Sequence, residues 1–171
     1  MTADNLILTP KRCLVSIVAL NMVSVLAQFV QIGLGITLIP IGLKVRNETP
    51  ETIGVTSAAL WLGMLVGLIV AGQLARKLGF RMTLVCGIAM SSLSFVLMPS
   101  INWHLWAIPT AAIGFGMDLR WIALETWLYS LVPTDARGRI VGIHEALLGL
   151  AFILGALLIV VIDATKPDIF G

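Results

Sequence analysis

The segment from Ile53 to Ala75, IGVTSAALWLGMLVGLIVAGQLA, decides the fold class of this chain. It contains no charged residue, and it is as long as the roughly 20 apolar residues that a helix needs to cross a hydrocarbon layer of about 30 Å. A single segment satisfies all of its backbone hydrogen bonds in lipid only when it is helical. The segment therefore predicts a membrane-spanning helix.

The composition of the whole chain agrees with a lipid environment. Of the 171 residues, 58% are hydrophobic and 12% are charged, whereas an average soluble domain is about 25% charged. The net charge of +2 is small and scattered along the chain, which argues against nucleic-acid binding, since that function normally shows a clustered basic face. We expect an all-α polytopic transmembrane helix bundle whose main partner is the lipid bilayer.

Five apolar runs account for most of the length, and short polar turns separate them. The first run is too long for a secretory signal, whose apolar region is typically about 7 to 15 residues. The expected spans cover about 13–41, 53–75, 82–98, 104–131 and 140–162.

The cations predict how the helices are threaded, because Lys and Arg of short loops are retained in the cytoplasm. One side of the membrane would hold Lys11, Arg12, Arg76, Lys77, Arg81, Arg137 and Arg139, and the other side only Lys44, Arg46 and Lys166. We therefore expect a cytoplasmic amino terminus and, after five crossings, an outer carboxyl terminus.

The turn after the second span carries a recognisable pattern. The stretch from Gly72 to Arg81 reads GQLARKLGFR, and it resembles the signature loop between helices two and three of the major facilitator superfamily. The matching residues that we take as the signature are Gly72, Lys77, Gly79 and Arg81. Arg76 stands where that family has an acid, so the contact that this acid makes between the two halves of family members is in doubt.

A second stretch strengthens the resemblance. Glu125, Thr126, Trp127 and Leu128 precede an Arg137-Gly138-Arg139 turn, which is similar to the region of helices four and five in a bacterial branch of the same family. The resemblance implies that residues 1–171 form a partial amino-terminal transmembrane domain, which is about one helix short of the first six-helix half. It further implies an inner-membrane secondary carrier of a small-molecule substrate, with a second transporter half as a possible partner.

Small residues recur at intervals of four in the second span, at Gly63, Gly67 and Ala71. Such a stripe lets another helix approach closely, which is how helices associate in lipid. We expect helix packing on this face, and a generic contact without any role in transport is equally consistent with the pattern.

Charged residues inside the fourth and fifth spans are the strongest candidates for function, since a charge at the bilayer centre costs about 2.5 to 3.5 kcal/mol on insertion scales. Asp118 and Arg120 are two residues apart, so they point to different sides of the helix and do not neutralise each other. Our hypothesis is that Asp118 and Arg120 face a polar substrate or ion path. The alternative is that they form structural ion pairs between helices.

The carboxylates of Glu125 and Glu145 are expected at similar depth, about 9 Å from the cytoplasmic turn. They would engage Arg81, Arg137 or Arg139, either as a gate or as structural ion pairs.

The sequence contains no motif for a phosphate loop, a catalytic nucleophile or a zinc site, and His104 and His144 lack paired ligands. We therefore predict no enzyme activity, no cofactor and no metal. The alternative to a carrier is a small non-transporting subunit, or a truncated fragment, that packs against a larger membrane partner.

Overall fold

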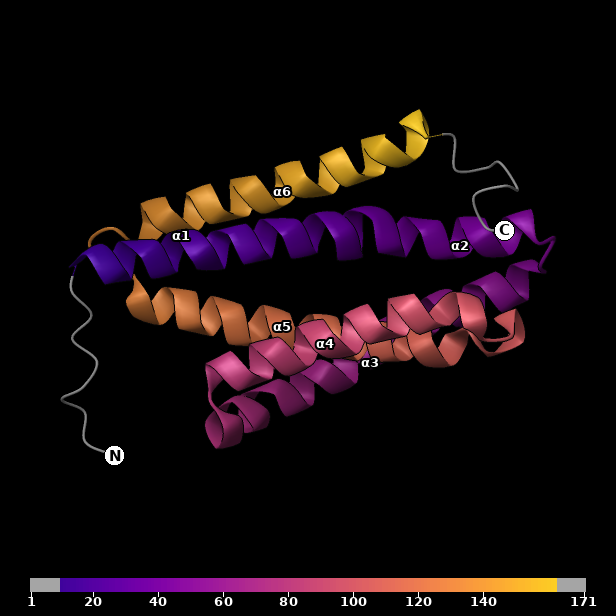
Figure 1. Ribbon diagram of the computed structural model, residues 1–171, viewed down its shortest axis with the longest axis horizontal. Helices are drawn as coiled ribbons and strands as arrows, with labels where there is room; N and C mark the ends of the chain where they lie inside the picture. The colour runs from indigo at the N-terminus through magenta and orange to yellow at the C-terminus, as the bar shows by residue number, and fades with distance from the viewer. Residues whose placement is uncertain (1–9, 163–171) are drawn as a thin grey trace.

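The computed structural model describes residues 10–162 as helices joined by short turns, with no strand among them (Figure 1). Residues 1–9 and 163–171 lie outside the described part, which therefore excludes Lys166 and the predicted outer carboxyl terminus. The side chains of Lys11 and Arg12 also lie outside it. The helices are α1 (Pro10–Ala27), η2 (Gln28–Gly35), α2 (Ile36–Val45), α3 (Pro50–Leu78), α4 (Phe80–Leu97), η3 (Met98–Ser100), η4 (Trp103–Leu105), α5 (Ala107–Leu131) and α6 (Arg137–Val161).

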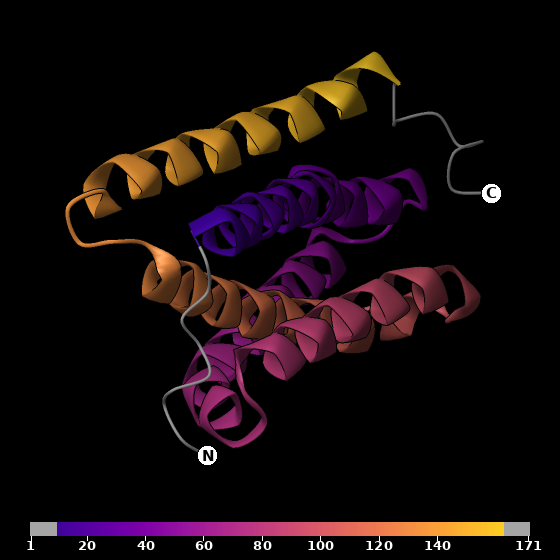
Figure 2. The same ribbon diagram turned by 60° about the vertical axis from the view of Figure 1, so that its left-hand side comes forward.

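The first three elements follow one another without a break and form one long rod (Figure 1). Its middle element, η2, is a π-helix, a conformation that is rare and often found at functional sites. Helix α6 packs on one side of the rod, and α3, α4 and α5 gather on the other side (Figures 1 and 2). The rod therefore lies between α6 and both α3 and α4.

Four helical segments are long and apolar enough to cross a membrane: Cys13–Val45, Pro50–Leu78, Phe80–Ser100 and Arg137–Val161. Helix α5 is not in this set, and it carries Asp118, Arg120 and Glu125. Its 25 residues still extend about 37 Å at 1.5 Å per residue, enough to cross the same layer. The prediction of an all-α membrane helix bundle is confirmed.

Glycine forms the turn between α3 and α4. Gly79 adopts a φ of 82°, a left-handed conformation that glycine accepts without the steric cost that a side chain brings. Its N–H donates to Ala75 O at 2.9 Å, and its carbonyl accepts from the Thr83 N–H. One residue thus ends α3 and begins α4.

The helices extend beyond several of the expected spans, since α3 continues to Leu78 and the rod continues to Val45. A helix can run past the apolar layer, because Lys and Arg side chains near its end reach the polar interface. The fourth span instead begins later than expected, at Ala107, after the short η4 turn.

Candidate functional site

Arg120 lies deep inside the bundle, near the middle of α5. Its side chain is only 2% exposed. The Nε–H donates a hydrogen bond to Gln31 Oε1 of η2 at 3.0 Å. This bond fixes the guanidinium against the π-helical segment of the rod.

The hydrogen bonding continues from the rod into α4. Gln31 Nε2 donates to Ser91 Oγ at 2.7 Å, and Ser91 Oγ donates to the Gly87 carbonyl at 2.9 Å. Gln31 and Ser91 are 5% and 0% exposed. A buried polar chain therefore links α5, η2 and α4, and in lipid such side-chain bonds help to hold helices together.

The backbone of α4 approaches α5 closely beside Arg120. A Cβ atom added to Gly87 would lie 2.6 Å from the Arg120 backbone nitrogen and 2.6 Å from the Gly116 oxygen. Side chains at these positions would push the helices apart. The glycines thus bring Ser91 within reach of Gln31.

A small cavity of ≈ 10 Å³ adjoins the guanidinium, which is room for about one water-sized occupant. It is lined by Ser24, Gln28, Arg120, Trp121, Leu124, Glu125, His144 and Leu148. Three of these side chains present buried polar atoms without a hydrogen-bond partner among the residues described: Arg120 Nη2, Gln28 Oε1 and His144 Nε2. The cavity wall thus offers one donor and at least one acceptor to an occupant.

His144 is fully buried, and its tautomer follows from its neighbour. Nδ1 lies 2.8 Å from Asn21 Oδ1. A carboxamide oxygen only accepts hydrogen bonds, so Nδ1 carries the proton and Nε2 of the neutral ring keeps its lone pair.

Asp118 lies on a different side of α5 from Arg120. It is half-buried, and a Cβ added to Gly67 of α3 would lie 2.8 Å from Asp118 Cβ. Asp118 is not among the side chains that line the cavity. The structure therefore brings Arg120, but not Asp118, to the polar cavity.

Glu125 lines the cavity. One of its carboxylate oxygens, one carboxylate oxygen of Glu145 and one ring nitrogen of His144 lie within 4.8 Å of one another. Among the predicted arginine partners, Arg81 and Arg139 are exposed, and Arg137 Nη2 donates to the Tyr129 carbonyl at 3.5 Å. In the part of the chain that the structure describes, no ion pair joins these arginines to Glu125 or Glu145.

The small residues of the second span face α5. A Cβ on Gly63 would collide with the Ala111 carbonyl oxygen, and one on Gly67 would lie 2.9 Å from the Phe115 oxygen. Ala71 continues this face and is fully buried. The signature residues Gly72, Lys77, Gly79 and Arg81 lie at the end of α3 and the start of α4.

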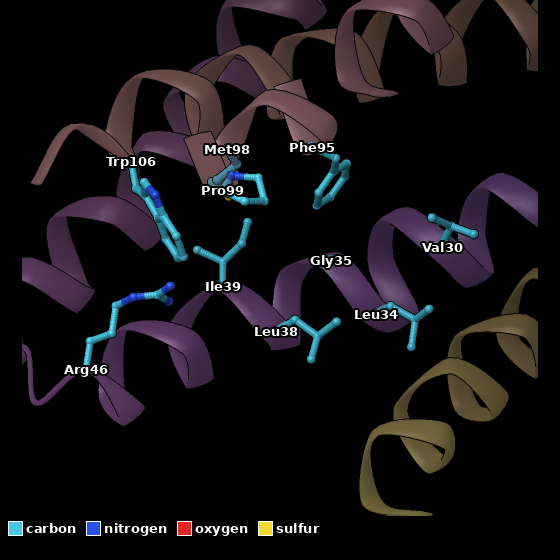
Figure 3. Close-up of a pocket in the computed structure, with 10 residues that line it drawn as sticks. All are labelled: Val30, Leu34, Gly35, Leu38, Ile39, Arg46, Phe95, Met98, Pro99 and Trp106. Carbon is cyan, nitrogen blue, oxygen red and sulfur yellow. The ribbon is translucent and has the colours of Figure 1, made fainter. Parts of the chain in front are cut away.

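A larger groove of ≈ 590 Å³ lies between the rod and the segment that joins the end of α4 to the start of α5 (Figure 3). Its walls are almost entirely apolar, with Val30, Leu34, Leu38 and Phe95 among them. At one end, the Arg46 guanidinium lies 5.0 Å from the centre of the Trp106 ring. In a membrane this groove offers little to a polar solute, so its volume does not mark it as the functional site.

The polar residues of the first span were not among the predicted site residues. Asn21, Ser24, Gln28 and Gln31 follow one another at intervals of three, four and three residues, a spacing that places them on one helix face. That stripe could have been recognised as the wall of a polar site. Ser91 had no such signal, since Ser92 and Ser94 follow it in the same run and nothing in the sequence distinguishes it from them.

Comparison with known proteins gives the chain its family. The sequence profile of the Major Facilitator Superfamily matches residues 15–165. An uncharacterized MFS-type transporter of Yersinia pestis (strain Pestoides F) is 24% identical over 128 residues, which cover 74% of this chain and 34% of the relative. The uncharacterized MFS-type transporter YfkF of Bacillus subtilis (strain 168) is 26% identical over 130 residues, covering 74% of this chain and 33% of the relative.

The chain thus spans about a third of the length of these curated relatives. No solved structure matches it. Because the family profile covers most of the sequence and the helices are those of a membrane bundle, the chain belongs to the major facilitator superfamily.

Proposed function

We propose that the chain forms part of a secondary active pathway for a small solute across the inner membrane, and that Arg120 contacts a hydrogen-bond acceptor on that solute. Membership of the family points to transport rather than to enzymatic catalysis. A second transporter half would complete the pathway, since carriers of this type bind solute between two repeats near the midplane.

The burial of Arg120 is the observation that carries this proposal. A charged residue inside a membrane protein normally faces the bundle interior and is paired, or it serves the transport path. The Arg120 guanidinium donates to a neutral amide, Gln31, and keeps Nη2 unpartnered at the cavity. A planar guanidinium presents several donors in a fixed fork, which suits a carboxylate or another polar acceptor.

Asp118 remains a candidate for the path in this proposal, although it lies against α3. Its carboxylate is only half-buried, so rocking of the proposed second half against this bundle would decide whether solute or the coupling ion reaches it. Transport in this family type involves rocking of one helix bundle against another.

The gate proposal concerns the end of the bundle toward which both the α3–α4 turn and the α5–α6 turn lie (Figure 1). These turns carry Arg81, Arg137 and Arg139, and we propose that they face the cytoplasm. Glu125 and Glu145 would pair with them when the pathway closes on that side.

Uptake by inside-out vesicles tests the role of Arg120. Vesicles with the wild-type chain and a co-expressed second transporter half are compared with vesicles in which the chain carries Arg120→Lys, Arg120→Leu or the exposed control Lys44→Gln, and the accumulated solutes are measured by mass spectrometry. We expect at least one polar solute to accumulate with the wild type and with Lys44→Gln, and to be lost in both Arg120 variants. Equal accumulation in all of them would contradict the proposal.

A further inference from the structure

Glu125 and Glu145, which the proposed gate pairs with arginines only when the pathway closes, form a cluster with His144, which the gate does not use. One carboxylate oxygen from each glutamate and one imidazole nitrogen lie within 4.8 Å of one another. Two carboxylates at this distance repel each other, and the repulsion is relieved by a proton or by a cation between them. The two carboxylates therefore require a proton or a cation between them.

The imidazole indicates which kind of cation fits. His144 is fully buried, and its Nε2 has no hydrogen-bond partner among the described residues. Nδ1 donates to Asn21 Oδ1, which fixes the ring and leaves the Nε2 lone pair available. A ligand histidine in a metal site is usually held in this way, through a hydrogen bond from its other nitrogen.

We propose that Glu125, His144 and Glu145 bind a divalent transition-metal ion. One nitrogen and two carboxylate oxygens form a donor set that suits Zn²⁺ and neighbouring first-row ions. Ligand distances in such sites are about 2.0 to 2.2 Å, so the ligands must move slightly closer together than they are here. Glu145 is exposed and Glu125 is half-buried, and rotation of these flexible side chains supplies that movement.

The location of the site gives it an access route. Glu145 lies eight residues after the start of α6 at Arg137, about 12 Å along the helix axis. An exposed carboxylate at that depth does not face lipid, because a charge there is too costly. The open side of the cluster therefore faces an aqueous path or a partner, through which an ion can enter.

Arg120 supplies a counter-charge for only one of the two carboxylates. Arg120 lines the same small cavity as Glu125 and His144, so the local groups are two carboxylates and one guanidinium. A divalent ion offsets both carboxylates and leaves the Arg120 guanidinium free of them. The site would therefore hold an ion while the pathway is open on that side, and Arg120 would remain available to other acceptors.

Zinc binding by the purified chain tests this proposal. The full chain, prepared without a polyhistidine tag and freed of metal by a chelator, is titrated with Zn²⁺ in detergent and followed by calorimetry. We expect one Zn²⁺ per chain. The affinity should fall by at least about tenfold in Glu145→Gln and in Asn21→Leu, the latter because its hydrogen bond orients the imidazole.

Glu145→Gln is the decisive variant, because the side chain is exposed and its replacement leaves the packing intact. His104→Gln, which removes an exposed histidine in the η4 turn, is the matched control and should bind as the wild type does. Absence of stoichiometric zinc in the wild type would overturn the proposal. Unchanged affinity in Glu145→Gln would overturn it as well.

Discussion

Arg120 of α5 and Gln31 of η2 are 89 positions apart in the sequence, yet Arg120 Nε donates to Gln31 Oε1 at 3.0 Å. Gln31 at the same time donates to Ser91 of α4. The amide therefore lies between a charge and a hydroxyl, and it joins three helices at one buried point. This arrangement makes Gln31 the residue on which the polar centre of the bundle depends.

Replacing Gln31 should destabilise the bundle. In Gln31→Leu the Arg120 Nε–H loses its acceptor inside the protein, and a buried donor left unpaired costs about 1 to 3 kcal/mol, or more when it is charged. We expect a lower Tm in detergent. Gln73→Leu changes an exposed glutamine of α3 and should leave the Tm close to that of the wild type. Equal Tm values for the two variants would show that the Gln31 bonds contribute nothing.

Ser91→Ala removes only the end of this hydrogen-bond chain. Gln31 Nε2 then loses its acceptor, and a neutral hydrogen bond contributes about 0.5 to 1.5 kcal/mol. The loss of stability should be smaller than in Gln31→Leu. Ser92→Ala, next to it but exposed, is the control. A loss in Ser92→Ala as large as that in Ser91→Ala would count against the chain from α5 to α4.

The contact between α3 and α5 predicts opposite effects at two glycines of one helix. A methyl group on Gly63 would collide with the Ala111 carbonyl, and overpacking of this kind costs about 1 to 3 kcal/mol. Gly54 has open space around its Cβ position, so Gly54→Ala should gain up to about 1 kcal/mol of helix propensity. Unfolding in detergent would measure both changes. A stable Gly63→Ala variant would mean that α3 and α5 lie further apart than described.

The threading of the helices predicts which turns are reached from each side. In a background with Cys13 and Cys86 replaced by serine, a cysteine at Thr134 should react with an impermeant maleimide only in inside-out vesicles. A cysteine at Asn47, in the turn before α3, should react only from the opposite face. Labelling of both positions from the same side would contradict the three crossings between them, and the exchanged pattern would contradict the proposed orientation.

The membrane bundle could be predicted from the sequence because its signal is collective. Runs such as 53–75 are too apolar and too long for a soluble core, and the turn at Gly79 was evident from its place between two such runs. The apolar runs do not predict the π-helix within the rod. A π-helix from Gln28 to Gly35 depends on how the helix packs against its neighbours, and no residue type predicts it.

The candidate site could be predicted only in part. Arg120 stood out because a charge within an apolar run is costly. Its partners Gln31 and Ser91 are neutral and distant in the sequence, so their pairing depends on the approach of α4 to α5 at Gly87 and Gly116. The cluster of Glu125 with His144 likewise joins two helices, and no spacing along one helix could reveal it.

Accessibility of position 145 tests most directly whether the polar cluster opens onto an aqueous pathway. A cysteine at Glu145 is compared with one at Leu150, which is exposed and lies about 140° around the same helix, again without Cys13 and Cys86. Only a thiolate reacts, and thiolates form in water rather than in lipid. With inside-out vesicles and a charged, impermeant thiol reagent, we expect rapid labelling at 145 and slow labelling at 150. Equally slow labelling at both positions would contradict this expectation.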